Sequence, residues 1–206
     1  MTDPLQALAP SGLALPDALV AGLRAAYAGP GRVYHGEAHV EDVARQFAEA
    51  GRGEPWSRPH EVYLAVLWHD AVYEPGAKDN EARSARLARA TVLRWLPHAG
   101  LDLGRVEQLI LWTARHGSLT PADVDGEAAR FLDCDMAILA APPDAFDAYD
   151  RAIAAEYAAL PRELYAAGRR AFLARLLASE RIFLSPDFHV RLDAAARANL
   201  ARALSG

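Results

Sequence analysis

Apolar side chains recur with helical spacing along nearly the whole chain, and glycines and prolines fall between the periodic segments. The alternating apolar and polar positions typical of half-buried strands are missing from the sequence. The pattern predicts helices near residues 16–28, 37–50, 60–73, 79–97, 102–116, 126–141, 143–160, 162–179 and 187–204. We therefore expect an all-α protein.

The length of 206 residues suits one domain with a large core. A hydrophobic share of 52% and a charged share of 24% are ordinary for a globular protein. We expect a single helical bundle over 1–206, with a core at about 30–141 and additional C-terminal helices at about 142–206.

The formal net charge of -5 argues against an extended nucleic-acid surface, although a local basic pocket stays open. No apolar run approaches the roughly 18 residues of a membrane-spanning helix, and residues 1–16 lack the features of a signal peptide. Cys134 is the only cysteine, so an intrachain disulfide is excluded. We expect a cytoplasmic protein without a membrane partner, and homo-oligomerisation stays open.

Four residues that commonly bind metals follow one another in the order His39, His69, Asp70 and Asp135. Each is expected on or beside the apolar face of its own helix. A buried charge or an unpartnered buried imidazole is costly unless something compensates it. Each alone fits a hydrogen-bonded core residue, but the four together favour a shared divalent cation.

The pair His69-Asp70 directly follows the segment 62–68, which is apolar on every side and predicts a central, buried helix. His39 borders the apolar stripe of the helix at 37–50, and His35 lies one turn before it. Imidazole nitrogen and carboxylate oxygen suit Mn²⁺, Fe²⁺, Zn²⁺, Co²⁺ or Ni²⁺. The expected cofactor is thus a divalent metal ion, one of these five or Mg²⁺.

Either Asp133 or Asp135 is a candidate for the last carboxylate ligand. On a helical wheel Asp135 falls at the centre of the apolar stripe, whereas Asp133 points away from it. The sequence therefore favours Asp135 as the ligand and places Asp133 in solvent, or beside the ligands if the helix begins later. The stripe consists of Phe131, Leu132, Ile138 and Leu139.

Further ionisable residues lie near predicted buried faces. Glu81 is a candidate general acid or base, or it stabilises the start of its helix. His116, just before a predicted helix stop, is a candidate for binding phosphate or a second metal. Alternatively, it lies there because the helix dipole favours a histidine at the C-terminal end. Lys78 and Arg115 either steer an anion or are simply solvated.

Several short segments extend this pattern beyond the four residues. Together they resemble the HD superfamily of metal-dependent phosphohydrolases, and more narrowly a bacterial family of predicted HD-superfamily hydrolases. Gly36 departs from that pattern, because an Asn is expected after the Tyr-His pair. The segments are 34–39 (Tyr-His-Gly-Glu-Ala-His), 68–73 (Trp-His-Asp-Ala-Val-Tyr), 79–84 (Asp-Asn-Glu-Ala-Arg-Ser), 132–135 (Leu-Asp-Cys-Asp) and 153–157 (Ile-Ala-Ala-Glu-Tyr).

The resemblance implies an α-helical HD fold and a divalent metal held by His39, His69, Asp70 and Asp135. It also implies hydrolysis of a small phosphorylated substrate such as a nucleotide, and we expect Asp70, Glu81 and His116 to take part. Two alternatives stay open. One is a non-catalytic sensor that binds a metal and a nucleotide, and the other is an HD-fold oxygenase with two irons.

Overall fold

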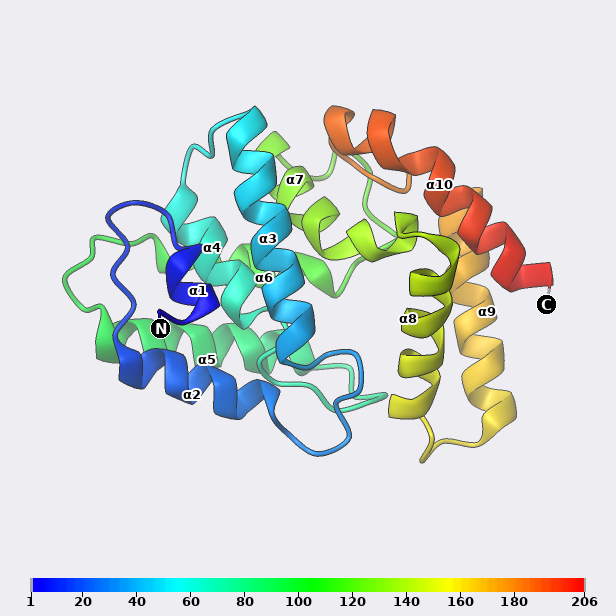
Figure 1. Cartoon of the computed structure of the whole chain (residues 1–206), viewed down its shortest axis with the longest axis horizontal. Coiled ribbons are helices and arrows are strands. Elements are labelled where there is room, and N and C mark those ends of the chain that lie inside the picture. Colours follow the sequence, from blue (N-terminus) through cyan, green and yellow to red (C-terminus); the bar gives the residue numbers. More distant parts are fainter. Residues whose placement is uncertain (1, 206) are drawn as a thin grey trace. The chain divides into compact units, whose positions relative to one another are not determined.

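The computed structural model describes residues 2–205, and this part of the chain is helical, with no strand (Figure 1). The prediction of an all-α protein is therefore confirmed. The helices are α1 (Pro4–Ala7), α2 (Asp17–Tyr27), α3 (Glu37–Gly53), α4 (Pro59–Trp68), α5 (Asn80–Trp95), α6 (Leu103–Thr113), α7 (Gly126–Met136), the 3-10 helix η1 (Ala137–Ala140), α8 (Pro143–Glu156), α9 (Arg162–Ala178) and α10 (Pro186–Ser205).

Each predicted helix is present, but some end earlier than the periodicity suggests. The segment expected as one helix at 126–141 is α7 followed by η1, and α6 ends at Thr113 rather than at 116. The short α1 was not predicted, because four residues are too few for a periodic pattern.

The most consequential difference concerns α4, which ends at Trp68 instead of continuing to residue 73. The backbone beyond it makes hydrogen bonds with side chains of α5 in place of helical ones. The Oγ of Ser84 accepts from the N–H of Val72 at 3.0 Å, and the Oδ1 of Asn80 accepts from the N–H of Glu74 at 3.1 Å. His69 and Asp70 thus lie in the turn after a buried helix and not inside it.

The chain divides into two compact units, Met1–Ala114 and Arg115–Gly206, here named the N-terminal unit and the C-terminal unit. The first contains α1 to α6 and the second α7 to α10. The sequence placed its division near residue 141 within a single domain, and that single-domain organisation stays a prediction.

Helix α4 forms the core of the N-terminal unit. Each residue from Val62 to Trp68 is at most 2% exposed, and α3, α5 and α6 pack against the helix. Because α4 is apolar on every side, it has neighbours on several sides, as its sequence predicted. The turn that carries His69 and Asp70 therefore begins at the end of a fully buried segment.

In the C-terminal unit, η1 packs against α7, α8 and α10 (Figure 1). The side-chain amide of Asn199 on α10 donates to the carbonyls of Leu139 and Ala141, at 3.0 and 2.8 Å. Arg197 of the same helix donates to the carbonyls of Leu177 and Ser179 at the end of α9. These bonds satisfy backbone acceptors that helix ends leave without a helical donor.

Among the described residues, no helix is both long and apolar enough to cross a membrane.

Replacing Leu64 by Ala tests the role of α4. Its side chain is fully buried, so we expect the free energy of unfolding to fall by about 2–5 kcal/mol, since a cavity remains. The matched control is Leu111→Ala on α6, where the side chain is 45% exposed, with an expected change of about 0.5 kcal/mol or less. Urea denaturation measures both variants, and equal losses would contradict the central position of α4 in the core.

Candidate metal centre

His39 lies in the first turns of α3, within the buried face of that helix. The face is formed by Val40, Val43, Ala44, Phe47 and Ala50. The imidazole of His39 is itself buried, with 3% exposure, although the sequence placed it only at the border of the apolar stripe. The packing of α3 on α4 brings this face toward the end of α4.

His69 is fully buried at the end of α4, and Asp70 follows in the turn with 15% of its side chain exposed. The ring of His69 is held by its own helix, because its Nδ1–H donates to the carbonyl of Val66 at 2.8 Å. With this proton on Nδ1, the Nε2 of a neutral His69 carries a lone pair that can accept a hydrogen bond or bind a metal. Metal-binding histidines commonly have their second ring nitrogen fixed in this way.

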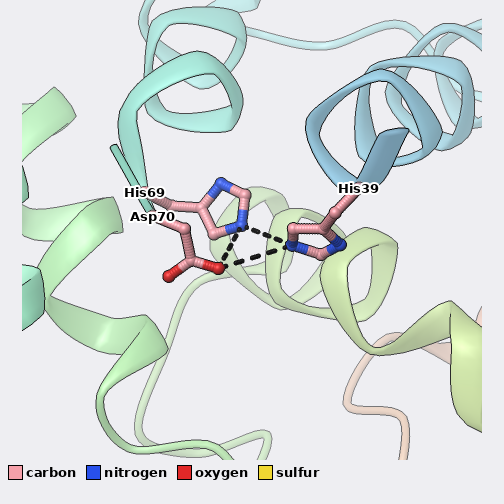
Figure 2. A group of neighbouring side chains, drawn as sticks. All are labelled: His39, His69 and Asp70. Atoms are coloured by element: carbon pink, nitrogen blue, oxygen red, sulfur yellow. Dashed lines mark hydrogen bonds and ion pairs between the residues drawn. The ribbon is translucent and has the colours of Figure 1, made fainter. Parts of the chain in front are cut away.

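Three ligand-type atoms meet at this point, as Figure 2 shows. The Nε2 atoms of His39 and His69 are 3.0 Å apart. The Oδ2 of Asp70 lies 3.4 Å from the first nitrogen and 3.3 Å from the second. The atoms come from helix α3 and from the turn that follows α4, and they form a nearly equilateral triangle.

The triangle has the size that a single bound cation requires. Metal bonds of about 2.0–2.2 Å at right-angled or tetrahedral positions separate neighbouring ligand atoms by about 2.8–3.6 Å. The three distances at the site fall within this range. Two imidazole nitrogens and one carboxylate oxygen also form a donor set suited to divalent transition metals. The residues present therefore fit such an ion.

The ionisation state of Asp70 also suits the binding of a cation. Burial of the carboxyl group opposes its ionisation, but the neighbouring imidazoles of His69 and His39 outweigh that effect and hold the pKa of Asp70 well below its usual range. The group is thus a carboxylate at neutral pH and needs a positive partner, which is either a protonated imidazole or a cation.

His35 lies beside this triangle. Its Nε2 is 3.9 Å from the Oδ2 of Asp70, and its ring stacks on Tyr73 with centroids 4.1 Å apart. The sequence placed His35 one turn before His39 but gave no sign of the stacking. Tyr73 follows Asp70 by three residues, and that spacing indicates a shared face only inside a helix, which has ended here.

Asp135 and His116 form a pair within the C-terminal unit. His116 follows α6 in a turn, Asp135 lies in the last turn of α7, and the two side chains are 2.8 Å apart. A carboxylate only accepts hydrogen bonds, so the Nε2–H of His116 donates to the Oδ2 of Asp135. The pairing was not predicted, because no sequence spacing relates two residues on separate elements. Their roles as fourth ligand and catalytic residue stay predictions.

The prediction that Asp133 faces solvent is wrong, because only 1% of the residue is exposed. Its Oδ1 accepts from the N–H of Leu184 at 2.7 Å, and its Oδ2 accepts from both the N–H and the hydroxyl of Ser185. The wheel assumed one buried face, whereas all residues of α7 from 128 to 134 are buried. Burial raises the pKa of Asp133 to about 6 against these three hydrogen bonds, which favour the carboxylate.

Of the remaining predicted residues, Lys78 and Glu81 belong to the N-terminal unit and Arg115 to the C-terminal unit. Glu81 is half-buried in the first turn of α5, next to Asn80, which holds the backbone of Glu74. Lys78 and Arg115 are exposed, which is what a solvated side chain requires. A catalytic role for Glu81 stays a prediction.

Comparison with known protein families, with curated proteins and with solved structures finds no match to this chain.

Removing the carboxylate of Asp70 should abolish metal retention. We expect the wild-type protein to keep one divalent transition metal per chain through dialysis, and Asp70→Ala to lose it, because one corner of the triangle is gone. Elemental analysis of the dialysed proteins measures this. His98→Ala, which removes an exposed imidazole, is the control and should keep the metal. Full retention by Asp70→Ala would refute the site.

Asp133→Asn should reduce stability without affecting metal retention. An amide cannot accept all three hydrogen bonds that the carboxylate accepts, so we expect a loss of about 1–3 kcal/mol in the free energy of unfolding. Chemical denaturation and elemental analysis of the same preparation report both properties. A folded variant that loses its metal would show that Asp133, and not only Asp70 and its neighbours, serves the centre.

Proposed function

We propose that the protein is a metal-dependent phosphohydrolase that acts on a nucleotide or another small phosphoester. The observation that supports it most is the buried triangle of His39, His69 and Asp70. Its donor set and spacing suit a divalent cation, and the order of the residues resembles the HD superfamily. When bound, such a cation lowers the pKa of a coordinated water and polarises a phosphoryl oxygen.

The residues of the chain have distinct tasks in this proposal. His39 and His69 supply neutral imidazole nitrogens, and the Nδ1–H bond of His69 to Val66 keeps its ring in one tautomer and orientation. Asp70 supplies the negative charge that makes the centre selective for cations. Three protein atoms leave coordination positions open, which a hydrolytic centre needs for water and substrate. Asp135 is the proposed fourth ligand.

His116 and Glu81 are the proposed groups for proton transfer and charge stabilisation. The hydrogen bond from His116 to Asp135 fixes which ring nitrogen carries the proton. An imidazole oriented by a carboxylate is a common arrangement for stabilising developing charge on a phosphoryl group. Glu81 is the proposed group that orients the attacking water. A net charge of -5 favours a small substrate over a long nucleic acid.

The same donor set also suits a second candidate function, that of an iron-dependent oxygenase. Two histidines and one carboxylate also bind the single iron of many oxygenases, so the triangle alone does not select hydrolysis. The two-iron oxygenase expected as an alternative from the sequence would need further ligands for its second iron. An oxygenase requires O₂ and a redox change at the metal, whereas phosphoester hydrolysis requires neither. A sensor would bind metal and nucleotide without turnover.

A phosphate-release panel tests the proposed reaction. Nucleotides and small phosphoesters are incubated anaerobically with the protein and Mn²⁺, Mg²⁺, Co²⁺ or Ni²⁺. We expect phosphate or pyrophosphate release from at least one substrate, and a loss of kcat/KM of about 100-fold or more in Asp70→Ala, since metal catalysis contributes several kcal/mol.

His98→Ala is the control for this panel and should keep full activity. Binding of a nucleotide without release would favour the sensor. A strict requirement for iron and O₂, with no phosphate release from any substrate, would overturn hydrolysis in favour of the oxygenase.

A further inference from the structure

Arg32 joins the two segments that carry the ligands of the N-terminal unit. It lies in the connection between α2 and α3, three residues before His35. Its Nη1 donates to the carbonyls of His35 and Asp70, at 2.7 and 2.8 Å, and its Nη2 donates to the carbonyl of Ala71 at 2.9 Å. The guanidinium thus reaches carbonyls that lie 38 and 39 positions after Arg32 along the chain.

Two of these carbonyl acceptors lie in the turn after α4, where helical hydrogen bonding has ended. Because α4 ends at Trp68, the carbonyls of Asp70 and Ala71 fall outside its helical hydrogen bonding. The N–H of Asp70 points to the hydroxyl of Tyr27 at 3.3 Å. The backbone N–H of Asp70 is thus held by Tyr27 and its carbonyl by Arg32. These two contacts fix the position of the backbone from which the carboxylate of Asp70 extends.

The guanidinium itself is held in place by aromatic rings. Its central carbon lies 5.2 Å from the ring centroid of Tyr27 and 5.7 Å from that of Tyr73, within the range of cation–π attraction. Tyr73 in turn stacks on His35. The planar fork of an arginine suits several carbonyls at once, whereas a lysine ammonium is a single point of charge.

We infer that Arg32 is a positioning residue of the metal centre, which sets the affinity for the metal by holding Asp70 opposite His39. This inference rests on the metal centre of the proposed function but not on the reaction that the centre catalyses. Arg32 acts through the backbone of His35, Asp70 and Ala71, and it takes no part as a ligand.

The direction in which metal affinity changes when Arg32 is removed separates a positioning role from a purely electrostatic one. A permanent positive charge beside a cation site repels the cation, so removing that charge would strengthen metal binding. Removing a group that orients the ligands weakens metal binding, commonly by about 10–100-fold. The two explanations predict opposite changes for the same substitution.

The test is a titration of the full-length protein with Co²⁺, against a competing chelator, in Arg32→Gln, Arg32→Lys and the wild type. We expect Co²⁺ affinity to fall by about 10–100-fold in Arg32→Gln and to fall in Arg32→Lys as well, although that variant keeps its charge. The visible absorption of bound Co²⁺ should also change, because the geometry of the ligands has loosened.

The matched control is Arg89→Gln. Arg89 also joins two segments of this unit, through two hydrogen bonds to Glu107 at 2.7 and 2.9 Å, but it touches none of the ligand-bearing backbone. Its loss should leave both the Co²⁺ affinity and the spectrum unchanged. Circular dichroism confirms folding, and Arg32→Lys carries the test if Arg32→Gln does not fold.

Wild-type affinity in both Arg32 variants, or tighter binding in Arg32→Gln, would overturn the positioning role while leaving the metal centre intact. A wild-type protein that takes up no Co²⁺ would instead overturn the metal centre itself, and with it this inference.

Discussion

The convergence of two imidazole nitrogens on one carboxylate oxygen is the constraint on which the N-terminal unit depends. His39, His69 and Asp70 place these atoms within 3.4 Å of one another in a largely buried position. Such a group is unfavourable unless a proton or a cation is shared among its members. The buried helix α4, its early end and the side chains that hold the following turn all serve to keep these atoms together.

The early end of α4 affects how the side chains of His69 and Asp70 are oriented. Inside a helix, adjacent side chains diverge by about 100°. In the turn after Trp68, the backbone of Asp70 is set by Tyr27 on one side, and that of Val72 and Glu74 by Ser84 and Asn80 on the other. The polar residues at the start of α5 thus support the site from outside it, as partners of metal ligands commonly do.

The helices and the burial of His39 and His69 could be predicted from the sequence, because apolar periodicity indicates which helix faces are buried. The end of α4 could not, since it is decided by hydrogen bonds from Ser84 and Asn80, which lie more than ten residues farther along the chain. Asp133 shows the limit of the helical wheel. A residue opposite the apolar stripe is still buried when its helix is covered on every side and when two backbone N–H groups meet its carboxylate.

The most direct measurement is the anomalous scattering from a crystal of the protein grown with Co²⁺ or Mn²⁺. We expect one strong peak at about 2.0–2.3 Å from the Nε2 of His39, the Nε2 of His69 and the Oδ2 of Asp70. A peak on other side chains, or no peak while His39 and His69 keep their direct 3.0 Å contact, would contradict it.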